Sequence, residues 1–290
     1  MTAETPSSTS TPLVLPDVAS LRACVRAWRA GGERVALVPT MGALHAGHMS
    51  LVEEGRKRAD RVVASIFVNP AQFAPHEDFS KYPRTLESDL AKLAAARCDA
   101  CFTPSVAEMY PDGFATTVSL NGPAKVELED HFRPTHFAGV ATVVAKLLNQ
   151  AQADCAVFGE KDYQQLKVIA RMAADLDIAT EIVGAPTVRE VDGLAMSSRN
   201  VYLSADERAR ATTIYRALKA IASKIAAGEV IAHEMTEARE MLVEAGFDID
   251  YIEARHAETL ERIARRIDGP IRLLVAARLG KTRLIDNIAV

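Results

Sequence analysis

The chain has 290 residues, enough for one large domain or two moderate ones, and 49% of them are hydrophobic while 25% are charged. These proportions exclude a globally disordered protein. Lys and Arg total 34 against 38 Asp and Glu, a formal net charge of -4. We therefore expect no basic surface for nucleic acid and favour small-molecule partners.

Neither a secretion signal nor a membrane helix is predicted. Residues 1–12 are rich in Ser, Thr and Pro and have no basic or apolar segment, so we expect a disordered tail. No later stretch reaches the roughly 18 apolar residues that a membrane helix needs, because His136 and Lys146 interrupt the best candidate. We expect a cytoplasmic protein with no membrane partner.

The first two-thirds of the chain alternate between short apolar segments and amphipathic helical patterns. The clearest predicted strands are residues 35–38, 62–68, 100–102 and 155–158, and the helices between them are residues 49–58, 84–96 and 137–149. This alternation is typical of βαβ units. It predicts an α/β fold in which a Rossmann-like parallel sheet carries helices on both faces.

After about residue 188 the pattern changes. We expect a long helical stretch over residues 205–227, another helix over 234–245, and strands over 248–254, 271–276 and 282–288. The chain is thus predicted to form a Rossmann-like domain over residues 13–187 and a smaller α+β domain over 188–290.

Residues 38–52 predict a strand, a glycine-containing turn and a helix. In parallel sheets ligands bind beyond the carboxyl ends of strands, and a helix N-terminus there favours phosphate. His45 and His48 are three residues apart and, if that turn is already helical, could donate hydrogen bonds to phosphate oxygens from one face of the first helical turn. In the alternative, one histidine caps the helix and the other is exposed. Gly42 and Gly47 favour the ligand site, because they would let the backbone approach a ligand closely.

Residues 158–165 repeat this layout of strand, turn and helix start. Lys161 could meet a phosphate and Asp162 a ribose hydroxyl, with Asp162 also placed to cap the helix. A capped turn with a solvated lysine explains the segment equally well when it is considered alone. Its position at another strand end is what favours a ligand site.

Two further segments carry polar groups. Ser197, Ser198 and Arg199 suit a polyphosphate leaving group, although a serine turn with a surface arginine is the simpler explanation. Asn69 and Gln72 follow a predicted strand, where neutral amides could fix a polar substrate, but Asn-Pro also begins ordinary turns.

Five motifs in order resemble those of the pantothenate synthetase family, within the nucleotidylyltransferase superfamily. They lie at residues 39–48, 67–73, 82–85, 159–165 and 196–200. Ala46 stands where the family usually has Glu, a difference from which we expect little consequence. The His-x-Gly-His pattern alone also fits class I aminoacyl-tRNA synthetases and cytidylyltransferases, so the other four motifs make the resemblance specific.

The resemblance implies a carbon–nitrogen ligase of coenzyme A biosynthesis. Pantoate would attack the α-phosphorus of ATP to give pantoyl adenylate and pyrophosphate, and β-alanine would then displace AMP to give pantothenate. The smaller domain would act as a lid that protects the adenylate from water. A homodimer is also implied.

The resemblance also implies site residues. His48, as the acid, together with His45, Lys161 and Arg199 would be catalytic, Asn69, Gln72 and Gln165 would hold pantoate, and Gln72 would lie near β-alanine. Magnesium would arrive on ATP, with Asp89 as its acidic partner or else as an exposed helix residue. The implied ATP-binding residues are Thr40, Met41, Gly42, Ala43, Leu44, His45, Ala46, Gly47, His48, Gly159, Glu160, Lys161, Asp162, Val188, Met196, Ser197, Ser198 and Arg199.

Two alternatives remain at this point. A nucleotidylyltransferase would leave the nucleotide on its product, whereas a non-catalytic module would bind ATP without turnover. Pyrophosphate exchange that depends on pantoate separates both from the ligase.

Overall fold

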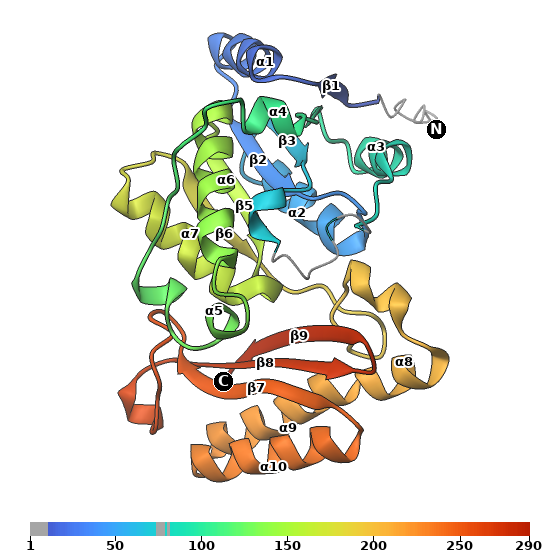
Figure 1. Ribbon diagram of the computed structural model, residues 1–290, viewed down its shortest axis with the longest axis vertical. Coiled ribbons are helices and arrows are strands. Elements are labelled where there is room, and N and C mark those ends of the chain that lie inside the picture. Colours follow the sequence, from blue (N-terminus) through green and yellow to red (C-terminus); the bar gives the residue numbers. More distant parts are fainter. Residues whose placement is uncertain (1–10, 74–78, 80–81) are drawn as a thin grey trace, which may run out of the picture.

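The structure is a computed structural model that describes residues 11–73, 79 and 82–290 (Figure 1). The tail expected over residues 1–12 therefore lies almost entirely outside the described residues. Within them, no helix is both long and apolar enough to cross a membrane.

Six parallel strands form the first sheet, in the order β1-β4-β3-β2-β5-β6. The strands are β1 (Leu13–Leu15), β2 (Val35–Thr40), β3 (Arg61–Ile66), β4 (Ala100–Phe102), β5 (Cys155–Gly159) and β6 (Glu181–Ala185). The predicted Rossmann-like parallel sheet is confirmed. The edge strands β1 and β6 add to the four predicted strands.

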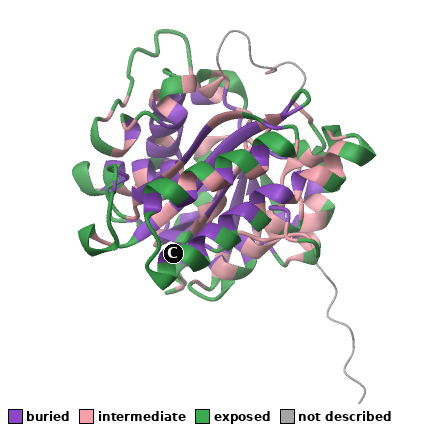
Figure 2. Ribbon diagram, turned by 90° about the horizontal axis from the view of Figure 1, so that it is seen from below, coloured by how far each residue is buried: buried purple, intermediate pink, exposed green. Residues whose placement is uncertain are grey.

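Helices cover both faces of this sheet. They are α1 (Val18–Ala30), α2 (Ala46–Arg56), α3 (Leu86–Ala95), α4 (Val106–Met109), α5 (Glu129–Phe132), α6 (His136–Ala151) and α7 (Tyr163–Asp175). In β2, Val35 and Leu37 pack with α1, α6 and α7, whereas Ala36 and Val38 pack with α2 and α3. Because successive strand side chains point to opposite faces, β2 lies at the centre of the domain between two apolar layers. Figure 2 shows buried residues in the interior of the molecule and exposed residues on the outer faces of the helices.

Single-turn helices join several of these elements. They are η1 (Pro70–Gln72), η2 (Gly122–Ala124), η3 (Glu160–Asp162), η4 (Ser198–Tyr202) and η5 (Arg266–Asp268). Two of them, η1 and η3, closely follow strands of the first sheet, so they lie at its carboxyl edge.

The C-terminal part contains α8 (Ala205–Ala211), α9 (Thr213–Ala227), α10 (Ile231–Glu244) and an antiparallel sheet of β7 (Asp248–His256), β8 (Ile271–Leu279) and β9 (Thr282–Ala289). Helices α9 and α10 pack on one face of this sheet, and its other face lies toward α5 (Figure 1). The helical stretch expected over residues 205–227 is confirmed as α8 and α9, which are separated only at Thr212, where the backbone is still right-handed helical. The Thr212 hydroxyl donates to the carbonyl of Ala209 at 2.9 Å and competes with the helical hydrogen bonds.

The change of architecture lies between β6 and η4. The boundary predicted at residues 187 and 188 falls in this connecting segment and stays a prediction.

Candidate active site

The two histidines form a compact pair at the start of α2. His45 is the N-cap residue, with extended backbone at φ −136°, and its Nδ1 accepts the Gly47 N–H at 3.1 Å. The Nδ1 of His48 accepts the His45 N–H at 3.2 Å. The ring centroids lie 4.1 Å apart. Because both Nδ1 atoms accept hydrogen bonds, each neutral ring carries its proton on Nε2 and can donate from there.

Both imidazoles are uncharged near neutral pH. Burial, with help from Lys161, lowers the pKa of His45 to about 4. Burial and the neighbouring His45 lower the pKa of His48 to about 3. The structure therefore gives the expected acid, His48, the form of a neutral hydrogen-bond donor rather than an imidazolium.

The expected geometry of this turn needs two corrections. His45 precedes the helix, so the pair does not project from the first helical turn as expected. Internal packing also explains both glycines. A Cβ at Gly42, where φ is +85°, would lie 3.2 Å from Asp89 and Ile66, and a Cβ at Gly47 would lie 2.9 Å from the His45 ring. The glycines therefore do not distinguish a ligand site from a structural turn.

Asp89 holds the turn that precedes His45. It is fully buried, and its carboxylate accepts the N–H groups of Ala43 at 2.9 Å and Leu44 at 2.8 Å and the Thr85 hydroxyl at 3.1 Å. The alternative that Asp89 is an exposed helix residue is wrong. These hydrogen bonds engage both carboxylate oxygens. The role of Asp89 as a partner of magnesium stays a prediction.

The turn after β5 brings Lys161 and Asp162 to the same edge of the sheet. The Lys161 side chain is 17% exposed, and its Nζ lies 4.0 Å from a carboxylate oxygen of Asp162, which is 49% exposed. Asp162 occupies the predicted N-cap position of α7, but its side chain makes no capping hydrogen bond. From β9, the Asn287 amide donates to the carbonyls of Glu160 at 2.9 Å and Lys161 at 2.8 Å. The C-terminal sheet thus fixes this turn.

Asn69 orients the amide of Gln72. Asn69 is 1% exposed, and its Nδ2 donates to Gln72 Oε1 at 3.1 Å and to the Gly139 carbonyl at 3.2 Å. Its Oδ1 accepts the Tyr110 hydroxyl at 2.7 Å. The Gln72 NH₂ group consequently turns toward Met41, with Nε2 lying 3.0 Å from the sulfur. Asn69 also lines the cavity described below, so its expected contact with pantoate stays a prediction.

The segment at the start of η4 forms the predicted serine turn and also lines a cavity. The Ser197 hydroxyl accepts the Arg199 N–H at 3.2 Å, which is the predicted serine turn. Ser197, Ser198 and Arg199 nevertheless all line a cavity with the histidines. The turn directs these three residues toward the histidine pair.

One cavity of about 230 Å³ brings the separate motifs together. Its lining includes Thr40, Met41, His45, Gly47, His48, Asn69, Gln72, Gly159, Lys161, Asp162, Gln165, Val188, Met196, Ser197, Ser198 and Arg199. The predicted nucleotide residues that it does not include are Gly42, Ala43, Leu44, Ala46 and Glu160. Glu160 instead pairs with Arg272 at 3.1 Å. A neighbouring cavity of about 750 Å³ shares Lys161, Gln165 and Arg199 and extends to β8 and β9.

Sequence reasoning missed the apolar side of the first cavity. It is formed largely by one face of α6 and includes Val140, Val143, Val144 and Leu147. It also assigned no role to Tyr82, which lines both cavities, or to Arg133 and His136, which line the larger one. For His136, the available signal was a polar residue placed directly before the apolar segment Phe137–Val144.

Comparison with known proteins gives a consistent result. A family model described as pantoate-beta-alanine ligase matches residues 13–289. A pantothenate synthetase of Rhodopseudomonas palustris is 59% identical over 279 residues, covering 96% of this chain and 99% of the relative. Pantothenate synthetase 2 of Bradyrhizobium diazoefficiens is 58% identical, with the same coverage.

Two solved structures agree in fold over almost the whole chain. Pantothenate synthetase from Thermus thermophilus has a TM-score of 0.90 at 48% identity and covers 95% of this chain and 98% of its own. A pantoate-beta-alanine ligase from Francisella tularensis, complexed with beta-gamma ATP and β-alanine, has a TM-score of 0.80 at 32% identity and covers 96% and 97%. From the family match over residues 13–289 and these full-length relatives, we conclude that the chain belongs to the pantoate–β-alanine ligase family.

Proposed function

We propose that this chain is an ATP-dependent ligase that joins pantoate to β-alanine through a pantoyl adenylate, releasing pyrophosphate and AMP. The family match and the names of the full-length relatives support this reaction. The Francisella neighbour, which holds a form of ATP and β-alanine, supports the two small-molecule substrates. The observation that carries the proposal is the single cavity that gathers His45, His48, Gln72, Lys161 and Arg199.

In the first step a pantoate carboxylate oxygen attacks the α-phosphorus. The bond from that phosphorus to the bridging oxygen breaks, and pyrophosphate leaves with the electron pair. The Nε2–H groups of His45 and His48 would donate to phosphate oxygens as their charge increases, while Lys161 and Arg199 would neutralise the leaving group. Such a displacement needs positioning and charge stabilisation rather than a nucleophilic side chain.

In the second step the β-alanine amine attacks the acyl carbon of the adenylate. The bond between that carbon and the AMP oxygen breaks, the new amide nitrogen loses a proton, and AMP leaves. Gln72 and Gln165 would hold the pantoyl group, and Gln72 would also lie near β-alanine. The α6 residues Val140 and Val143 line the same cavity and suit the dimethyl carbon of pantoate.

Magnesium would enter bound to ATP. Among residues 11–73, 79 and 82–290, no group of three or more His, Cys, Asp or Glu side chains is arranged to hold a metal ion. Magnesium in nucleotide-binding enzymes is usually held by phosphate oxygens and water together with one or two carboxylates. When bound, the ion would supply further neutralisation of phosphate charge.

The deciding experiment is exchange of labelled pyrophosphate into ATP, with pantoate present and absent. We expect exchange only with pantoate, and AMP formation only when β-alanine is added. Pyrophosphate exchange that occurs without pantoate, or a product that retains the nucleotide, would support a nucleotidylyltransferase. ATP binding without exchange would support a non-catalytic module. The homodimer, the cytoplasmic location and the closing motion of the C-terminal part remain predictions.

A further inference from the structure

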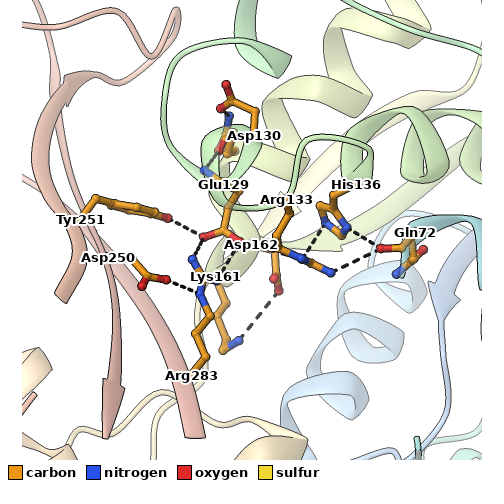
Figure 3. A network of polar contacts seen from close by, with 11 residues as sticks. Gln72, Glu129, Asp130, Arg133, His136, Lys161, Asp162, Asp250, Tyr251 and Arg283 are labelled. Carbon is orange, nitrogen blue, oxygen red and sulfur yellow. Dashed lines mark hydrogen bonds and ion pairs between the residues drawn. The ribbon is translucent and has the colours of Figure 1, made fainter. Parts of the chain in front are cut away.

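Two side chains hold the backbone carbonyl of Gln72. His136 Nδ1 lies 3.1 Å from this oxygen, and Arg133 donates to it from Nη2 at 3.4 Å (Figure 3). Arg133 Nη1 lies 3.1 Å from His136 Nε2. A guanidinium can only donate, so Nε2 accepts and the His136 proton lies on Nδ1, where it is donated to Gln72. Arg133 thereby selects the tautomer that holds the carbonyl.

Glu129 links this pair to the C-terminal sheet. Its Oε2 lies 3.9 Å from Arg133 Nη1, one helical turn away. From β9, Arg283 donates to both carboxylate oxygens, at 2.8 and 2.7 Å, and from β7 the Tyr251 hydroxyl donates at 2.9 Å. Burial raises the pKa of Glu129, but Arg283, Tyr251 and Arg133 together lower it below its usual value. The charged carboxylate thus connects both parts of the chain.

The position of Gln72 depends on these contacts. Gln72 ends η1, a single turn in which the hydrogen bond from its N–H to the Asn69 carbonyl is long, at 3.4 Å. The side chain is oriented by Asn69, but the peptide that carries it is held at its carbonyl by His136 and Arg133. A shift of this peptide moves the amide in the cavity.

We propose that His136 and Arg133 are positioning residues, which fix Gln72 for the pantoyl group, and that Glu129 makes this position depend on Arg283 of the C-terminal sheet. The inference rests on the proposed function, because it takes Gln72 as a pantoate residue. The C-terminal sheet would then influence the affinity for pantoate through the Gln72 carbonyl, although no residue of that sheet contacts this carbonyl directly.

The first test compares His136→Leu with His136→Asn. Asparagine can place an N–H donor near the position of Nδ1, whereas leucine cannot. Loss of one well-placed hydrogen bond corresponds to about a tenfold change in affinity. We expect His136→Leu to raise the KM for pantoate about tenfold, with the KM for ATP near wild type, and His136→Asn to recover most of the loss. Equal KM values in all three proteins, or equal losses for both substrates, would overturn the positioning role.

The second test measures coupling across the two sheets. Glu129→Gln keeps the side-chain shape but removes the charge, so it should raise the KM for pantoate several-fold in the wild-type background and much less beside His136→Leu. Additive effects would refute the link. If Glu129→Gln does not fold, Tyr251→Phe removes one donor to the same carboxylate and takes its place in the cycle.

These outcomes are distinguishable from failure of the proposed function. A wild-type protein without pantoate-dependent exchange would refute that function. An active wild type that is impaired by Gln72→Ala but unaffected by His136→Leu would refute only the positioning inference.

Discussion

Gly139 provides a sharp test of how closely α6 and η1 must approach. A Cβ at this position would overlap the Ala71 carbonyl oxygen and lie 2.7 Å from the Gln72 nitrogen. Ordinary van der Waals contact therefore requires η1 to move by about 1 Å. The Ala71 backbone cannot rotate away as a flexible side chain would. Gly139→Ala should thus displace the peptide that carries Gln72.

The two expected effects of Gly139→Ala differ in size. Overpacking costs about 1 to 3 kcal/mol, and replacing glycine by alanine inside a helix recovers about 1 kcal/mol. The protein should remain folded. A displacement of about 1 Å at a positioned substrate group can reduce the rate by about 10²-fold. We therefore expect a large loss of pantoate-dependent exchange with a small loss of stability.

Gly55→Ala is the matched control. Gly55 also lies within a helix, but a Cβ there would meet only side-chain carbons, the nearest being Ala36 Cβ at 3.2 Å. Exchange rates and thermal unfolding of both variants should be compared with the wild type. A Gly139→Ala protein that exchanges at the wild-type rate would show that the position of η1 does not control the reaction.

Three further predictions concern the histidine pair. His48→Ala should reduce the adenylation rate by about 10² to 10⁴, measured by single-turnover kinetics, and a near-normal rate would contradict its role as a donor. Gly47→Ala should displace the His45 ring, which lies 2.9 Å from the added Cβ, so exchange should fall while circular dichroism stays unchanged; unaltered exchange would count against the His45 assignment. The pKa of His48 is lowered from 6.5 to about 3, so the unfolded chain binds the proton first and stability should fall as the pH drops below about 6.5. Between pH 6.5 and 4, the free energy of unfolding measured with urea should decline less steeply in His48→Gln than in the wild type. An identical slope in both proteins would contradict the lowered pKa of this ring.

The central strands were predictable because strands buried on both faces are continuously apolar. Strands β2 to β5 have this character. The edge strand β1 is apolar but lies between Pro12 and Pro16 beside the expected tail, and β6 contains Glu181 and Gly184, so neither was predicted. The separation of α8 from α9 is a single residue, Thr212, within a strongly helical stretch, and no sequence pattern marks it.

The candidate site was predictable where function requires polar residues just beyond strand ends. His45, Gln72 and Lys161 are of this kind, and the cavity includes all three. The residues that orient them were not predictable, because their contacts join distant parts of the chain. His136 contacts Gln72, which lies 64 residues earlier in the sequence, and no local sequence pattern indicates that contact.

Through the side-chain amide of Asn287, the C-terminal sheet stabilises one wall of the first cavity. Its two hydrogen bonds satisfy successive carbonyls in the turn that carries Lys161. If residues 188–290 were removed, both carbonyls would lose these donors, and the lysine would lose the backbone that directs it. We therefore expect a chain truncated after residue 187 to lack a correctly formed turn at Lys161 even if its parallel sheet folds. Any exchange of C-terminal parts between relatives must preserve an amide donor at this point.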